Sequence, residues 1–231
     1  MGWRSCFSRI IIMKKIIGFI AITAFISCKS GYLEGKKSSV ILNIGQESDD
    51  LAFVNLKNYS RDFVYDMKYA TTDNFLKEKV YPCSECYLRV KTVKALLAAN
   101  ATFLTKGYKI KIYDCYRPLS IQKKMWEIVP DANFVADPKK GSIHNKGGAV
   151  DISLVDSLGV ELNMGTTFDF FGKEASHNYL EFSEEILANR RLLKEIMLQN
   201  NFKSFDSEWW HYNLNKASED KVSNLKWRCD N

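Results

Sequence analysis

Two short segments, far apart in the chain, contain most of the residues from which a metal site could be built. Residues 142–151 read SIHNKGGAVD and residues 208–211 read EWWH, and together they hold two of the chain's three histidines. Two imidazoles and a carboxylate, with a second carboxylate nearby, are the ligands and base of a catalytic zinc site. The candidate ligands are His144, Asp151 and His211, and the candidate base is Glu208. This interpretation requires a fold that brings the two segments together.

The residues between the first two candidate ligands support the interpretation as a metal site. Gly147 and Gly148 provide the backbone freedom that lets His144 and Asp151 approach one ion. Asp151 lies in the apolar run AVDISL, where an unpaired carboxylate would be costly. An isolated histidine is more often structural than a ligand, and we interpret His177 in this way. Two histidines and one carboxylate also suit iron or manganese.

The formal net charge of +6 arises mainly from the start of the chain. Residues 1–27 contain four of the 33 basic residues and no acidic residue, so the remainder has 29 basic against 27 acidic residues. This near balance does not predict a surface that binds polyanions. We therefore expect no nucleic-acid partner.

Residues 1–28 resemble an export signal preceded by a short extension. Lys14 and Lys15 precede an apolar run that is too short to span a bilayer comfortably. The run ends in FISC, which resembles the lipobox of bacterial lipoproteins, whose cysteine, here Cys28, becomes the lipidated N-terminus. Met13 is then the expected true start, and this lipid anchor is the one membrane contact that we expect. An ordinary cleaved signal and an uncleaved anchor are the alternatives.

The rest of the chain divides into a tether, one domain and a tail. Residues 29–50 are polar and indicate a flexible tether. Residues 51–215 contain the regular hydrophobic patterns, and a hydrophobic content of 46% provides for a sizeable core. Residues 216–231 form a polar tail in which Trp227 is the main apolar anchor.

Within the domain, the periodicity of apolar residues predicts both strands and helices. Alternation predicts strands over 63–69, 108–113 and 149–154, and one or two strands within 202–214. Helical spacing predicts helices from Tyr87 to Gly107, from Leu119 to Val129, and from an N-cap at Ser183 to Asn200. Since no regular strand-helix-strand period occurs, we predict a single α+β domain with a central, largely antiparallel sheet and packed helices.

Export would place four cysteines in an oxidising compartment, where one or two disulfides are expected. They are Cys83, Cys86, Cys115 and Cys229. Cys83 and Cys86 also form a CxxC pair, but a zinc knuckle needs a second pair at short spacing. A thioredoxin-like redox site needs a strand that leads into the motif, and Pro82 disfavours one. A structural disulfide or free thiols are therefore the favoured interpretation.

The order of several motifs resembles a known family. The matching motifs are SxHxxGxAxD at 142–151, ExxH at 208–211, DxYRP at 114–118 and FDF at 168–170. Together they resemble the zinc D-alanyl-D-alanine metallopeptidases, in particular the dipeptidases of the vancomycin-resistance type, over about residues 50–215. The resemblance implies an α+β fold with a central antiparallel sheet, one zinc ion per chain, and hydrolysis of the small dipeptide D-alanyl-D-alanine.

The resemblance also implies roles for single residues. The zinc ligands correspond to His144, Asp151 and His211, and the general base corresponds to Glu208. Arg117 corresponds to an arginine that stabilises negative charge on the scissile carbonyl oxygen; a structural salt bridge is its alternative role. Asp169 corresponds to the receptor of the substrate's amino group, with a loop hydrogen bond or helix cap as the alternative. Tyr69 and Ser142 correspond to residues that line the pocket.

Two further interpretations of the same residues remain. One is a D,D- or L,D-carboxypeptidase that acts on longer peptidoglycan stem peptides; Asp169 favours the free dipeptide instead. The other is a zinc-containing binding protein without catalysis. Ile143 departs from the small polar residue that is common before His144 in the family. The leader and cysteines differ from the cytoplasmic resistance enzymes and indicate the cell envelope, either the periplasm or a membrane-anchored lipoprotein.

Overall fold

The computed structural model describes residues 44–47, 49–132, 134–227 and 229. The expected export signal, the lipobox at Cys28 and most of the expected tether lie outside the described residues. Within these ranges, no helix combines the length and the apolar character that crossing a membrane requires.

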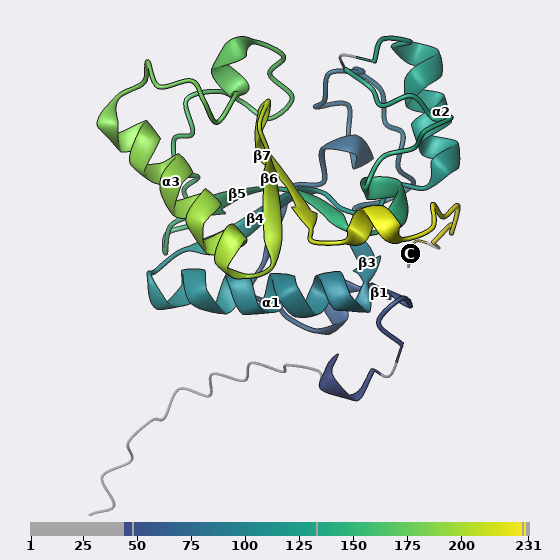
Figure 1. Ribbon diagram of the computed structural model, residues 1–231, viewed down its shortest axis with the longest axis horizontal. Coiled ribbons are helices and arrows are strands. Elements are labelled where there is room, and N and C mark those ends of the chain that lie inside the picture. The colour runs from purple at the N-terminus through teal and green to yellow at the C-terminus, as the bar shows by residue number, and fades with distance from the viewer. Residues whose placement is uncertain (1–43, 48, 133, 228, 230–231) are drawn as a thin grey trace, which may run out of the picture. The chain divides into compact units, whose positions relative to one another are not determined.

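A five-stranded sheet forms the centre of the described domain (Figure 1). Its strand order is β2 (Val64–Tyr65), β4 (Lys109–Asp114), β5 (Ala149–Val155), β7 (Glu208–Leu214) and β6 (Phe202–Phe205). β2 runs parallel to β4, and the other neighbouring pairs are antiparallel. This arrangement confirms the predicted α+β class with a largely antiparallel sheet.

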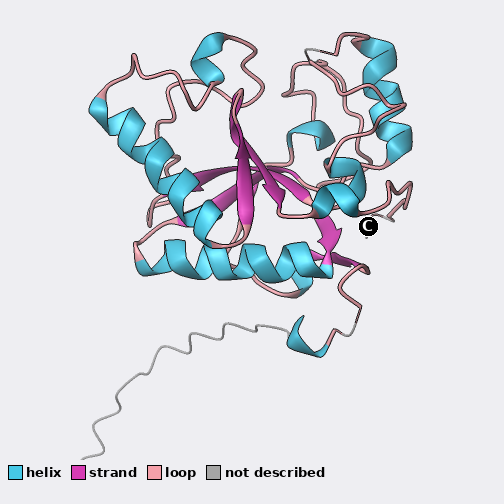
Figure 2. Ribbon diagram, viewed as in Figure 1, coloured by secondary structure: helices cyan, strands magenta, loops and turns pink. Residues whose placement is uncertain are grey.

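The described residues also form three α-helices, which accompany the sheet (Figure 2). They are α1 (Val90–Thr105), α2 (Leu119–Ile128) and α3 (Glu184–Gln199). α1 contacts β4, α3 contacts β6 and β7, and α1 and α3 contact each other. Ser183 caps α3 as predicted, because its hydroxyl accepts a hydrogen bond from the backbone N–H of Ile186. Every residue of the central strand β5 is buried, so the candidate ligand on this strand lies deep in the domain.

A second, two-stranded sheet pairs β1 (Phe53–Asn55) with β3 (Tyr87–Arg89). The helix that we expected from Tyr87 therefore starts only at Val90, after a strand. Helical periodicity does not reveal this strand, because its hydrogen-bonding partner is distant in the sequence.

The strand expected over residues 63–69 is also shorter than predicted. Only β2 is extended, and a 3-10 helix at Lys68–Ala70 follows it. Tyr69 and Ala70 are consecutive residues and both are buried. The 3-10 turn places both side chains in the interior of the domain.

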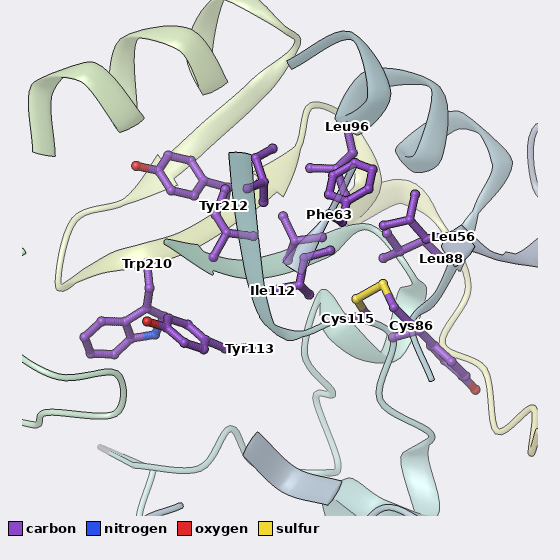
Figure 3. Packing of buried hydrophobic residues seen from close by; sticks show 14 of the residues in the cluster. Leu56, Phe63, Cys86, Leu88, Leu96, Ile112, Tyr113, Cys115, Trp210 and Tyr212 are labelled. Carbon is purple, nitrogen blue, oxygen red and sulfur yellow. A yellow bond between two sulfur atoms is a disulfide. The ribbon is translucent and has the colours of Figure 1, made fainter. Parts of the chain in front are cut away.

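Two disulfides form, where one or two were expected, and each joins one cysteine of the CxxC pair to a distant partner. Cys83 is bonded to Cys229, and Cys86 is bonded to Cys115. The Cys86–Cys115 bond lies among buried apolar side chains such as Leu88 (Figure 3). Because the two cysteines of the pair have different partners, the CxxC is neither a redox pair nor a zinc knuckle.

The segment after β7, which we expected to be a polar tail, packs on the domain. Ala217 is fully buried, and the ring of Trp227 stacks on Tyr87 with a centroid distance of 5.6 Å. Lys91 on α1 donates a hydrogen bond of 2.7 Å to the Asp220 carboxylate. The Cys83–Cys229 bond lies immediately beyond Trp227 and fixes this segment covalently.

The environment of His177, which we interpreted as a structural residue, predicts how the free energy of unfolding depends on pH. Burial, followed by the nearby positive charge of Lys194 and Arg190, lowers the pKa of His177 to about 3. In the unfolded chain this histidine titrates near pH 6.5. Between these values the unfolded state binds the additional proton, so stability falls as pH decreases from about 6.5 toward 3. The expected loss is at most about 1.4 kcal/mol per pH unit.

His177→Phe is expected to remove this part of the pH dependence. The measurement is urea unfolding of both proteins at several values between pH 5 and pH 7. The difference in unfolding free energy between variant and wild type should then increase as pH falls. A difference that stays constant over this range would contradict a half-buried, neutral His177.

Candidate metal centre and active site

The central sheet and the turn before it bring the three candidate ligands together. Asp151 on β5 and His211 on β7 are directly opposite each other in an antiparallel pair, so their side chains share one face of the sheet. His144 reaches them from the short 3-10 helix that precedes β5. Gly147 ends this helix in the left-handed conformation, with φ of 71°, and a Cβ atom there would lie 2.3 Å from the ring of Phe53. Only glycine allows this turn.

The three donor atoms form a compact triangle. His144 Nε2 lies 3.3 Å from Asp151 Oδ1 and 3.2 Å from His211 Nδ1. His211 Nδ1 lies 2.9 Å from Asp151 Oδ1. Ligands about 2.0–2.1 Å from one tetrahedral zinc ion lie about 3.3 Å apart. The donor set and its spacing therefore fit a zinc ion.

In each of the two histidines, the ring nitrogen outside the triangle makes a hydrogen bond that orients the imidazole. His144 Nδ1 lies 2.6 Å from the carbonyl oxygen of Cys115, and His211 Nε2 lies 3.0 Å from Asn213 Oδ1. When these nitrogens carry the proton, His144 Nε2 and His211 Nδ1 are free to bind a metal. Sequence reasoning missed both partners. The position of Asn213, two residues after His211 on a predicted strand and hence on the same face, was an available signal.

Glu208, the candidate base, is the first residue of β7 and lies at the edge of the triangle. Its Oε2 atom is 3.8 Å from His211 Nδ1, and a third of its side chain is exposed. Burial raises the pKa of Glu208 above its ordinary value, with His211 opposing this effect and the charge of Asp151 adding to it. A carboxylate in such a position can accept a proton from water beside the metal.

Arg117 is held rigidly beside the centre. Its Nη2 donates to Asp114 at 2.7 Å and its Nη1 donates to Gln122 at 2.9 Å. Its guanidinium lies 5.2 Å from the ring centroid of Tyr69. Burial is the largest single influence and lowers the pKa of Arg117, but the charge and hydrogen bond of Asp114, together with Tyr81 and Tyr69, raise it well above its ordinary value, so the side chain stays charged. Both interpretations of Arg117 agree with this geometry, since the residue makes a buried salt bridge next to the candidate ligands.

Asp169 and Tyr69 are brought together by a hydrogen bond of 3.0 Å from the tyrosine hydroxyl to Asp169 Oδ2. Burial raises the pKa of Asp169 well above its ordinary value, and the negative charge of Asp151 raises it further. A bound ammonium group would oppose both effects, because an opposite charge favours the ionised carboxylate. The site is thus suited to a cationic ligand.

Beyond Asp169 the molecule is hollowed into a cleft of about 770 Å³. Its walls include Tyr113, Phe168 and Glu161. Ser142, the remaining expected pocket residue, accepts a hydrogen bond of 3.2 Å from the backbone N–H of His144. The serine therefore supports the turn that carries the first candidate ligand.

A buried two-histidine, one-carboxylate set next to a carboxylate of raised pKa defines a metal-dependent hydrolase. The chain belongs to the D-Ala-D-Ala dipeptidase family of zinc metallopeptidases, whose profile matches residues 49–226.

The chain is also similar to proteins named D-alanyl-D-alanine dipeptidase. The chain is 33% identical over 171 residues to a D-alanyl-D-alanine dipeptidase of Escherichia coli, covering 74% of this chain and 89% of the relative. It is 29% identical over 186 residues to a D-alanyl-D-alanine dipeptidase of Enterococcus faecium, covering 71% of this chain and 92% of the relative. The chain is also similar to a solved structure of a vancomycin resistance D,D-pentapeptidase in complex with Zn(II). The matched region has 15% sequence identity and includes 60% of this chain and 80% of the pentapeptidase chain. The TM-score of this superposition is 0.39.

Proposed function

We propose that this protein is a zinc-dependent dipeptidase that hydrolyses D-alanyl-D-alanine to two D-alanines. The observation that carries the proposal is the Asp169 carboxylate, which Tyr69 holds within electrostatic range of Asp151 and Glu208. A carboxylate so close to the candidate metal centre binds the free ammonium group of a dipeptide and disfavours a substrate with an acylated N-terminus. Family membership and the named activity of the relatives support the same conclusion.

The proposed mechanism assigns one task to each group. His144, Asp151 and His211 would hold one zinc ion, which lowers the pKa of water and polarises a carbonyl group when bound. Glu208 takes a proton from the attacking water and then donates it to the leaving amine. Arg117 stabilises the negative charge that develops on the carbonyl oxygen. Asp169 and Tyr69 bind the ammonium end, so that the peptide bond lies between Glu208 and Arg117.

The direct test compares three substrates with purified protein: D-Ala-D-Ala, N-acetyl-D-Ala-D-Ala and L-Ala-L-Ala. Release of free alanine should be fastest from the first, should stop after treatment with a chelator, and should return when zinc is added. Metal analysis should give one zinc ion per chain. Faster cleavage of the acetylated peptide would instead favour a carboxypeptidase. Binding of the peptides without release of D-alanine would favour the binding protein without catalysis.

Replacing the amine receptor should selectively weaken use of the free dipeptide. In Asp169→Asn, the loss of a charged hydrogen bond worth about 1.5–3 kcal/mol should lower kcat/KM for D-Ala-D-Ala by about 10- to 150-fold. Cleavage of N-acetyl-D-Ala-D-Ala, which has no ammonium group, should change little. Steady-state kinetics with both substrates check this result.

A matched control for this variant is Asp73→Asn. Asp73 lines the same cleft but is exposed and pairs with Lys68 at 2.7 Å. Its replacement should leave the preference for the free dipeptide unchanged. Equal losses on both substrates in Asp169→Asn would show that Asp169 has a structural role and does not bind the amino group.

We also propose that the protein works in the cell envelope, in the periplasm or as a lipoprotein anchored through Cys28. The two disulfides support an oxidising compartment, and the resemblance of FISC to a lipobox supports lipidation. Cell fractionation checks the anchor: the wild type should be found with the membrane, and Cys28→Ala should reduce that fraction strongly. Equal membrane fractions in both would contradict lipidation at Cys28.

A further inference from the structure

Arg190, on α3, is a buried cation that binds backbone oxygens instead of an acid. Its side chain is only 5% exposed. Nε donates to the carbonyl of Met164 at 2.7 Å, Nη1 to that of Ser176 at 3.0 Å, and Nη2 to that of Glu174 at 2.9 Å. Among the described residues, no carboxylate forms a salt bridge with Arg190. A charge desolvated in this way is costly, so its hydrogen bonds must serve the structure around it.

The three carbonyls belong to the two ends of one loop, residues 164–176. The loop carries Asp169 near its middle, in the left-handed conformation with φ of 57°. A residue other than glycine keeps such a conformation only where its surroundings hold it there. The guanidinium closes the loop at both ends, and Trp209 Nε1 adds a hydrogen bond of 2.8 Å to Thr166. The loop that carries Asp169 is therefore held by side chains of both α3 and β7.

The same end of the loop also holds the turn that precedes the candidate base. The backbone N–H of His177 and the hydroxyl of Ser176 both donate to the carbonyl of Asp206, each at 2.9 Å. Asp206 lies in the turn between β6 and β7, two residues before Glu208. In Figure 1 the segment between β5 and α3 lies close to the tip of this hairpin. A continuous set of hydrogen bonds thus runs from Arg190 through Ser176 to the turn of Glu208.

We propose that Arg190 is a positioning residue that fixes Asp169 and Glu208 at the distance a dipeptide requires. The inference rests on the proposed dipeptidase function. Glu208 and Asp169 come from separate segments, and Arg190 binds the loop that joins both to α3. A guanidinium is suited to this task because its planar fork directs donors to three carbonyls at once. Lysine would keep the charge but has one compact ammonium group.

Arg190→Lys is the first variant to measure. We expect a folded protein with one zinc per chain and with kcat for D-Ala-D-Ala lowered by up to about 10²-fold, since a misplacement of about 1 Å has this effect. The preference for D-Ala-D-Ala over N-acetyl-D-Ala-D-Ala should fall as well, because Asp169 is displaced. The separate variant Arg191→Lys is the control, because Arg191 is exposed and pairs with Glu184 on the same helix. Its kinetics should equal those of the wild type.

A purely structural role would give a different pattern. If Arg190→Lys lowers the thermal midpoint but keeps kcat and the substrate preference within about two-fold of the wild type, the inference is overturned. If the wild type does not cleave the dipeptide, the proposed function fails, and this inference fails with it. If the wild type cleaves the dipeptide and Arg190→Lys is unaffected, the proposed function stands and only the inference about Arg190 is overturned.

Ser176→Ala keeps the inference testable if Arg190→Lys does not fold. At this half-buried position the substitution deletes the hydrogen bond that the hydroxyl donates to the Asp206 carbonyl and the one that it accepts from the backbone N–H of Asn178, and it leaves the Arg190 contacts in place. We expect kcat to fall by about 2- to 10-fold, as for the loss of one ordinary hydrogen bond, while the substrate preference stays unchanged. An unchanged kcat would overturn the coupling between the loop and the hairpin of Glu208.

Discussion

Glu208→Gln is expected to lower kcat for D-Ala-D-Ala by about 10²- to 10⁴-fold while zinc binding is retained. The amide has nearly the same shape as the carboxylate but cannot accept the proton of the attacking water. Zinc content should stay near that of the wild type, because Glu208 lies outside the ligand triangle, 3.8 Å from His211 Nδ1. Single-turnover kinetics and metal analysis of the same preparation check both statements.

Glu195→Gln is the matched control for this substitution, since Glu195 is an exposed carboxylate on α3. It should retain the activity of the wild type. If Glu208→Gln retained most of its activity, another group would have to act as the base. If it lost zinc together with activity, Glu208 would be a ligand, and the triangle of His144, Asp151 and His211 would be an incomplete description of the centre.

The double substitution Cys83→Ser/Cys229→Ser is expected to have the largest effect on stability. The Cys83–Cys229 bond closes a loop with a sequence separation of 146 residues, so its loss increases the entropy of the unfolded chain considerably. The expected decrease in unfolding free energy is about 2–5 kcal/mol. For a domain of this size, the thermal midpoint should fall by roughly 10 °C. Calorimetry under non-reducing conditions measures this change.

Loss of one disulfide is expected to affect activity differently from loss of the other. Below its unfolding temperature, Cys83→Ser/Cys229→Ser should keep kcat, because this bond holds only the segment after β7. The Cys86–Cys115 bond closes a shorter loop, and it lies next to the Cys115 carbonyl, which orients His144. The double substitution Cys86→Ser/Cys115→Ser removes this bond. It should therefore also weaken zinc binding, by about 10- to 100-fold. Equal thermal midpoints for wild type and the first variant would show that Cys83 and Cys229 are not paired in the protein.

Local sequence patterns were sufficient for much of the fold. The alternation of AVDISL predicts β5, and the serine followed by two acidic residues predicts the start of α3 at Glu184. Both signals are local: side-chain alternation and end capping depend on residues within a few positions of each other. The candidate ligands were also available from the sequence, because few residue types bind zinc and Gly147 marks the turn between His144 and Asp151.

Other features depend on contacts between distant residues, which no local period encodes. β3 is a strand only because β1 pairs with it, and the cysteines could be paired only after the fold had placed them. The partners that orient the two imidazoles, Cys115 and Asn213, acquire that role through their distance from His144 and His211.

Arg190 shows the same division between sequence and tertiary structure. In the sequence it is one of two adjacent arginines on a predicted helix, and nothing local distinguishes it from Arg191. In the structure Arg190 is buried against three carbonyl oxygens, while Arg191 is exposed. The sequence by itself determined which residues could bind metal and where the main strands and helices lie. Only the tertiary structure decided which groups orient them, because hydrogen bonding and burial depend on segments that meet through folding.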